Sequence, residues 1–134
     1  MKKKLCRVLA FMLVLALCSG IPAMAVEPRT NSYISSGAAT ITDNGDGSVT
    51  VGFDVAGTGK MTKIGASYIY IKNSSNTTVK TYSYPTYSSL QGSNRVSYGT
   101  TVTYNGTKGV TYHAVVVLYA ANSSGSGTLT VTAY

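Results

Sequence analysis

Apolar and polar residues alternate with a period of two along several stretches of the chain. The clearest is 48–56, where Val49, Val51, Phe53 and Val55 are separated by small or polar residues. The same alternation recurs in 95–104 and 127–134. Because successive side chains of a β-strand point to opposite faces of a sheet, this pattern predicts strands that each place one face on a core.

Turn-forming residues separate these stretches, since Gly and Asn adopt the backbone conformations that tight turns require. The expected turns include Asn44-Gly45, Gly57-Thr58-Gly59, Gly92-Ser93-Asn94 and Asn105-Gly106. Seven strands are expected, near 32–42, 48–56, 63–72, 78–84, 95–104, 111–121 and 127–134. Short strands with a turn signal about every ten residues predict an all-β sandwich of antiparallel strands, and strand spacing leaves a closed barrel open as the alternative.

The segment "GVTYHAVVVLYAANSSGSG" at 109–127 refines this expectation. It places Tyr112 two residues before the small Ala114, and both fall on one face of the expected strand. The pattern resembles the sixth strand of immunoglobulin-like and fibronectin type III domains, in which such a tyrosine closes a corner of the sandwich. The resemblance implies a single immunoglobulin-like β-sandwich. The chain has no tryptophan, so an antibody-type domain is not expected.

The first 25 residues are predicted to be a secretory signal peptide, which leaves 26–134 as one β-sandwich domain. Three lysines at 2–4, an apolar run at 8–17 and small residues at 23 and 25 are the three parts of an export signal. We expect cleavage between Ala25 and Val26 and a secreted, extracellular bacterial protein without a membrane anchor. A retained membrane helix is the alternative, for which the apolar run is short.

Cleavage would change the composition of the chain. Four of the 11 Lys and Arg residues and both cysteines lie in the first 25 residues, so the formal charge of +7 falls to +3 and the mature chain is disulfide-free. This mild charge does not suit a nucleic-acid partner. The remaining 109 residues suffice for one domain with its own core, and we expect a monomer.

A wider resemblance covers the layout of the mature chain. It rests on Glu27-Pro28-Arg29, Gly57-Thr58-Gly59-Lys60-Met61, Ile64-Gly65-Ala66, and Tyr104-Asn105-Gly106-Thr107 leading to Tyr112. In these residues the chain resembles a family of small secreted proteins from Gram-positive bacteria that is catalogued as a domain of unknown function. The resemblance implies secretion and a β-sandwich, and it implies no activity.

The stretch "TDNGDGSVTV" at 42–51 is the most motif-like part of the chain. A calcium loop of the EF-hand type needs oxygen ligands at positions 1, 3 and 5 and glycine at position 6. Counting from Asp43 puts Gly45 and Gly47 at ligand positions, and counting from Asn44 puts Val49 at the glycine position. Turn chemistry accounts for all of these residues, so we predict a hairpin and neither a metal nor a cofactor.

Catalytic residues are scarce. His113 is the single histidine, and the strand pattern points it away from the core with no acid near it in sequence. A pair of carboxylates for glycoside hydrolysis would have to come from Glu27, Asp43, Asp46 and Asp54. Three of these lie at or beside turns, so we expect a protein that is not an enzyme, with a small hydrolase as a remote alternative.

The outer face of the strand at 111–121 gives the strongest indication of binding. His113, Val115, Val117 and Tyr119 fall on the face opposite the core. Large apolar side chains in a row on an outer face need either cover or a partner. Neighbouring residues such as Tyr68 or Tyr70 would supply the cover, and otherwise the row is a binding face.

Eleven tyrosines add a second candidate surface. Tyr82, Tyr84 and Tyr87 surround a proline that ends or borders a strand. They would form a recognition surface or pack over the open end of the sandwich. We therefore expect a secreted interaction module that binds a protein or cell-surface component, and the alternative is a carbohydrate-binding module that uses exposed tyrosines.

Overall fold

The computed structural model describes residues 31–134, so the expected signal peptide and its cleavage site between Ala25 and Val26 lie outside the described part. Eight strands and one short 3₁₀ turn follow one another along the chain. They are β1 (Ile34–Asp43), β2 (Ser48–Met61), β3 (Lys63–Asn73), β4 (Thr78–Ser83), η1 (Ser88–Leu90), β5 (Gln91–Gly92), β6 (Arg95–Asn105), β7 (Tyr112–Asn122) and β8 (Gly125–Ala133).

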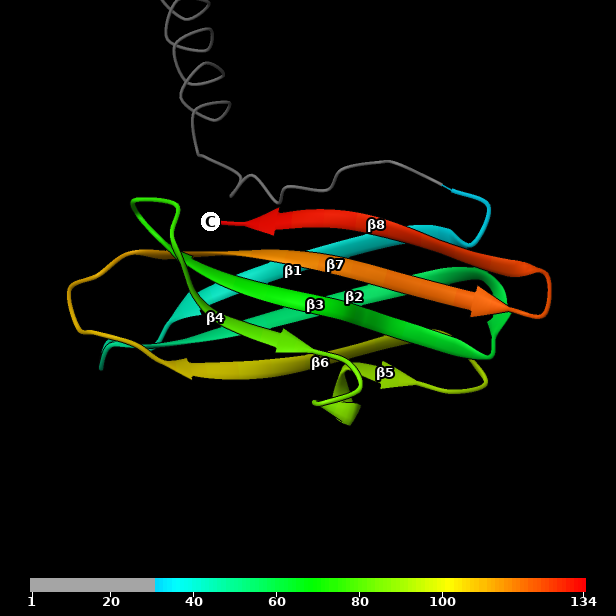
Figure 1. Cartoon of the computed structure of the whole chain (residues 1–134), viewed down its shortest axis with the longest axis horizontal. Helices are drawn as coiled ribbons and strands as arrows, with labels where there is room; N and C mark the ends of the chain where they lie inside the picture. The colour runs from blue at the N-terminus through cyan, green and yellow to red at the C-terminus, as the bar shows by residue number, and fades with distance from the viewer. Residues whose placement is uncertain (1–30) are drawn as a thin grey trace, which may run out of the picture.

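The strands form two antiparallel sheets packed face to face (Figure 1). A three-stranded sheet has the order β1-β2-β6, and a five-stranded sheet has the order β4-β3-β7-β8 with the two-residue β5 paired to β3. The chain therefore crosses between the sheets after β2, again before β6, and again before β7. This is the immunoglobulin-like sandwich predicted from the sequence. Because the strands form two separate sheets, the alternative of a closed barrel is excluded.

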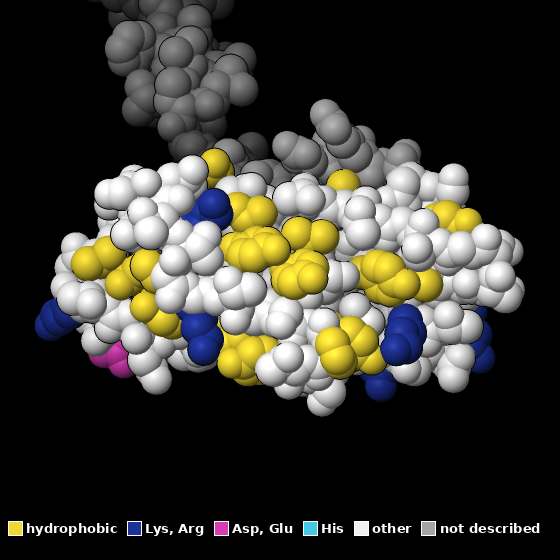
Figure 2. Space-filling view, in the orientation of Figure 1, with side chains coloured by type: hydrophobic (Ala, Val, Ile, Leu, Met, Phe, Trp, Pro, Cys, Tyr) yellow, Lys and Arg dark blue, Asp and Glu magenta, His cyan; other side chains and the backbone are white. Residues whose placement is uncertain are grey.

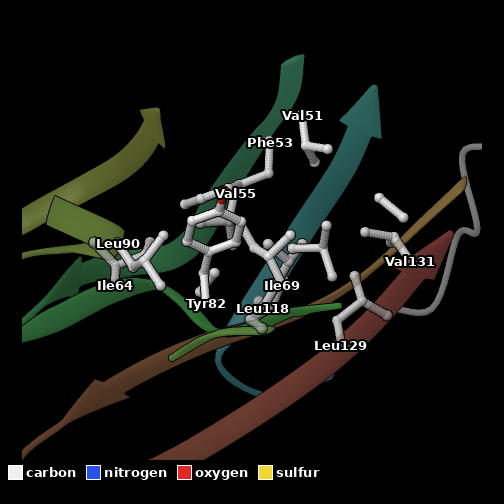
Figure 3. Close-up of a cluster of buried hydrophobic side chains, with 14 of the residues drawn as sticks. Val51, Phe53, Val55, Ile64, Ile69, Tyr82, Leu90, Leu118, Leu129 and Val131 are labelled. Atoms are coloured by element: carbon white, nitrogen blue, oxygen red, sulfur yellow. The ribbon is translucent and has the colours of Figure 1, made fainter. Parts of the chain in front are cut away.

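Each sheet turns one face towards a shared core. Alternate residues of β2, β3, β7 and β8 supply it, and Val51, Ile69 and Leu118 are completely buried there (Figure 3). Val116 is completely buried as well. The edge strand β6 contributes less than its alternation predicts. Tyr98, Val102 and Tyr104 are partly buried against the core, whereas Val96 is 55% exposed.

One expected turn is wrong, and a second is shorter than expected. β2 was expected to end at residue 56 but continues to Met61, because Thr58 donates its backbone N–H to the carbonyl of Tyr33 at 3.0 Å and so extends the pairing at this edge. The turn expected at 92–94 is present at 93–94, where Asn94 has a φ of 56°. Only its first residue differs, because Gly92 pairs with Ile64 of β3 as part of β5.

Candidate functional site

A β-bulge in β3 decides which side chains reach the outer face of the five-stranded sheet. Before the bulge Ile64 and Ala66 face the core, and after it Ile69 and Ile71 do so, so the inward parity changes from even to odd. The register shift lies between Ala66 and the next paired residue of the strand. An extra residue in one strand of an antiparallel pair shifts all later side chains to the other face. The two tyrosines at positions 68 and 70 consequently point outwards.

The neighbouring strand β7 brings its outer residues beside these tyrosines. In the register, Tyr68 lies opposite Val117 and Tyr70 lies opposite Val115. Tyr119 continues the row on β7, and β8 adds Thr128, Thr130 and Thr132 on the other side of it. We call Tyr68, Tyr70, Val115, Val117 and Tyr119 the tyrosine–valine face.

The tyrosine–valine face is partly covered by its own members and partly open. The rings of Tyr68 and Tyr70 stack on each other with centroids 5.6 Å apart and planes 10° apart. Tyr68 is 42% exposed, and Tyr70, Val115, Val117 and Tyr119 are half-buried. Figure 2 shows apolar side chains gathered across the middle of this sheet over β3 and β7. The two expectations for this row were cover by Tyr68 or Tyr70 and a binding face, and each is partly met. The tyrosines flank the valines, and they leave an apolar surface in contact with solvent.

His113 lies at one end of this row. Its Nε2 lies 3.2 Å from the amide oxygen of Asn76, and its ring stacks on that of Tyr134 with centroids 5.6 Å apart. Beside it in the register is Lys72 of β3. The hydrogen-bonding partner of the imidazole is therefore a neutral amide, where a catalytic triad would place a carboxylate.

Tyr82 is buried, which favours the packing interpretation over the recognition surface. It faces the core from β4, is 7% exposed, and donates its hydroxyl hydrogen to the carbonyl of Thr103 in β6 at 2.9 Å (Figure 3). This bond joins the two sheets at the edge where β4 and β6 approach each other. Burial raises the pKa of Tyr82, and the ammonium of Lys80 opposes that rise. Packing over the open end of the sandwich is the role the structure gives this residue.

Tyr87 and Tyr84 follow in the connection after β4, which contains a cis Tyr84–Pro85 bond. The ring of Tyr87 meets that of Tyr82 edge-on at 4.9 Å, so it covers the same edge of the sandwich. Tyr84 instead points towards β3 and accepts a hydrogen bond from Nζ of Lys63 at 2.9 Å. This hydrogen bond is the main reason that the pKa of Lys63 is raised, and the nearby Tyr119 adds a smaller electrostatic contribution. Tyr84 and Lys63 thus adjoin the end of the tyrosine–valine face opposite His113.

The loop at 43–48 is a hairpin connection between β1 and β2, as the sequence predicts. Asp43 accepts a hydrogen bond from the backbone N–H of Gly45 at 2.8 Å, and Asp46 accepts one from that of Ser48 at 2.9 Å. Gly45 and Gly47 have φ of 81° and 95°, which explains the glycines. The hydroxyl of Ser48 also donates to Asp46, and these bonds lower the pKa of that carboxyl. Both aspartates therefore accept hydrogen bonds from backbone N–H groups of the loop itself.

The structure also shows a hollow that sequence reasoning missed, on the outer face of the three-stranded sheet. Its volume is about 410 Å³, and Asp54 lies in it between Ala38 of β1 and Gly99 of β6. A Cβ at Gly99 would collide with the carboxylate of Asp54, so the absence of a side chain there makes room for it. Arg95 also lines the hollow. The small residues that line the hollow belong to three different strands, so they are brought together only by the pairing register of those strands.

Comparisons of the chain with protein-family models, with curated proteins and with solved structures find no match. The resemblance to a family of small secreted proteins accordingly stays a prediction. In the part of the chain that the structure describes, no helix is long and apolar enough to cross a membrane, and no three His, Cys, Asp or Glu side chains gather as metal ligands do.

Proposed function

We propose that the protein is a secreted, non-enzymatic interaction module that binds a protein partner through the tyrosine–valine face. The observation that carries this proposal is the outward row of Tyr68, Tyr70, Val115 and Val117 on the five-stranded sheet. Tyrosine supplies a large contact area with a polar tip at little cost in side-chain entropy, which is why it is frequent in protein interfaces.

The position of the face in the fold supports this role. β3 and β7 are central strands of their sheet, and each is hydrogen-bonded on both sides. The inner faces of the same strands are anchored in the core by Ile69, Ile71, Val116 and Leu118, all completely buried. A surface on such strands changes little in shape on binding, so little conformational entropy is lost when a partner docks.

The orientation of the rings favours a protein over a sugar. A sugar-binding platform offers the flat face of an aromatic ring to the sugar, whereas Tyr68 and Tyr70 each turn one face to the other in a parallel stack. Between and beside them lie the branched side chains of Val115 and Val117. Mixed aromatic and aliphatic surfaces of this kind are typical of the apolar centre of a protein interface.

Site-specific photo-crosslinking in cells that produce the protein tests the proposal. A photoreactive phenylalanine analogue would replace Val117 in one variant and Thr101 in the control, because Thr101 is exposed on the outer face of the other sheet. We expect a discrete protein adduct from position 117 and a much weaker one from position 101. The additional substitution Tyr68→Ser should reduce the adduct from position 117. Equal adducts from both positions would contradict the proposed face.

A glycan-binding module remains the second candidate, and one observation favours it. The ring of Tyr134 stacks on His113 and yet is 89% exposed, so it is far more accessible to a sugar than the rings of Tyr68 and Tyr70. Screening of the secreted protein on an array of plant, host and bacterial wall polymers tests this alternative. Binding that Tyr134→Ala abolishes and Tyr68→Ser leaves unchanged would establish it in place of the protein interface.

A further inference from the structure

We propose that the partner of the tyrosine–valine face is an acidic protein surface, in which carboxylates flank an apolar centre. This inference rests on the function proposed above and adds the chemistry of the partner. It follows from the distribution of charge over the two sheets and from the positions of two lysines relative to the tyrosines.

The net side-chain charge of residues 31–134 is carried by the strands of one sheet. These residues include six cationic side chains and three carboxylate side chains. The carboxylates, Asp43, Asp46 and Asp54, all lie in β1, β2 or the loop between them. Lys60, Arg95 and Lys108, in β2, β6 and the loop after β6, balance them in number. The remaining three cations are Lys63, Lys72 and Lys80, and all of them lie in β3 or β4 of the five-stranded sheet.

Two of these lysines frame the tyrosine–valine face along β3. Lys63 lies opposite Ala121 and Lys72 lies opposite His113, so each is in register with an outward residue of β7. Along β3 this face therefore carries a lysine, then two tyrosines, then a second lysine. Lys63 and Lys72 are nine positions apart, which corresponds to about 30 Å at the usual rise of a strand. The hydrogen bond to Tyr84 holds the Lys63 ammonium at this end of the face and raises its pKa.

An apolar centre with cations at its rim matches the anatomy of a protein interface. In such interfaces charged residues are depleted at the centre and retained at the rim, where they speed association and select the partner. A binding site for an anionic polymer differs, because closely spaced cations follow the charged backbone. On this face the space between the two lysines is occupied by Tyr68, Tyr70, Val115 and Val117. The occupant must therefore bring apolar side chains as well as negative charge.

Immobilised polymers of known chemistry test the preference with the secreted protein. The probes are a random copolymer of glutamate and tyrosine, polyglutamate, and polygalacturonate, which carries carboxylates on a polysaccharide. Surface plasmon resonance measures binding at low and at physiological salt. We expect the copolymer to bind at least about tenfold more tightly than polyglutamate or polygalacturonate, with an association rate that falls as salt rises.

Matched charge variants show which lysines contribute to copolymer binding. Lys63→Glu with Lys72→Glu should weaken copolymer binding about tenfold or more, whereas Lys60→Glu with Lys108→Glu, which changes the net charge equally, should have an effect below about threefold. Because Lys63 also bonds Tyr84, the milder pair Lys63→Gln with Lys72→Gln serves as a second test, and thermal unfolding confirms that each variant is folded. Equal losses from both glutamate pairs, equal binding to all three polymers, or no binding at all would overturn the inference.

A failure of the acidic-partner inference can be distinguished from a failure of the proposed function. If position 117 forms a protein adduct in cells but neither lysine pair affects the adduct or the copolymer, the face binds a neutral partner and only the acidic chemistry is wrong. If position 117 forms no more adduct than position 101, the proposed function itself fails.

Discussion

The phenolic oxygen of Tyr112 accepts a hydrogen bond from the backbone N–H of Thr107 at 2.9 Å. Tyr112 begins β7 in the five-stranded sheet, and Thr107 follows β6, which belongs to the three-stranded sheet. The ring is 8% exposed and lies over Gly106, where a Cβ would come within 2.7 Å of it. The bond therefore fastens the connection that carries the chain from one sheet to the other, and it is the corner that the sequence pattern around Tyr112 predicts.

Replacing Tyr112 by phenylalanine should destabilise the protein by about 1 kcal/mol, because it leaves the ring in place and removes the acceptor for Thr107. Urea denaturation measures the change in the free energy of unfolding. Tyr134→Phe is the matched control, since Tyr134 is 89% exposed, and its effect should stay below about 0.5 kcal/mol. Equal effects of the two substitutions would show that the corner bond contributes nothing to stability.

The raised pKa of Tyr82 predicts that the protein loses stability at alkaline pH. Burial raises its pKa above the ordinary value of 10.0, so the folded state holds the phenolic proton more tightly than the unfolded state does. The stabilisation is fully present below pH 10.0 and is lost as the pH rises through the higher folded-state value. Tyr82→Phe should cost about 1 kcal/mol at neutral pH through the lost bond to Thr103. It should also reduce the fall in unfolding free energy between neutral and strongly alkaline pH, measured by urea denaturation across that range.

The strands of this fold could be predicted because the residues that specify them are local. Alternation defines 48–56, and Asn44-Gly45 marks the hairpin before it, while Asn105-Gly106 marks the connection that leads to 111–121. The bulge in β3 could not be predicted in the same way. Along 64–71 large apolar or aromatic residues occupy both parities after the bulge, so the pattern does not say whether the tyrosines or the isoleucines face the core. The pairing with β7 decides it.

The candidate site shows the same division between local and non-local information. The outer residues of β7 follow from the period of two once the pattern at Tyr112 assigns the core face, and the structure places Val115, Val117 and Tyr119 on the outer face. The different roles of Tyr82 and Tyr84 depend on which strands meet at an edge, since one tyrosine bonds β6 and the other bonds β3. Residues with similar sequence surroundings thus acquire different roles through tertiary contacts.

Ser48 should control the acidity of Asp46. The hydroxyl and backbone N–H of Ser48 both donate to this carboxylate and lower its pKa from the ordinary value of 3.8. Any stabilisation from these bonds is present above pH 3.8 and is lost as the pH falls through the lower folded-state value. NMR titration of the carboxyl carbon measures the pKa directly. Ser48→Ala should move it back towards 3.8, and the distant Ser124→Ala should not. An unchanged pKa in Ser48→Ala would show that the backbone bond alone sets it.

Val116 and Val117 are adjacent on β7 and face opposite sides of the sheet, so the same substitution at each separates core packing from binding. Val116 is completely buried and Val117 is half-buried on the tyrosine–valine face. Val116→Thr places a hydroxyl in the core and should cost about 1–3 kcal/mol. Val117→Thr leaves its hydroxyl within reach of water and should change stability by less than about 0.5 kcal/mol. Thermal or urea unfolding gives both values, and the adduct formed by a photoreactive residue at position 68 should weaken only in Val117→Thr. A large loss of stability from Val117→Thr would mean that this face is already covered in the isolated protein, which would leave no open surface for a partner.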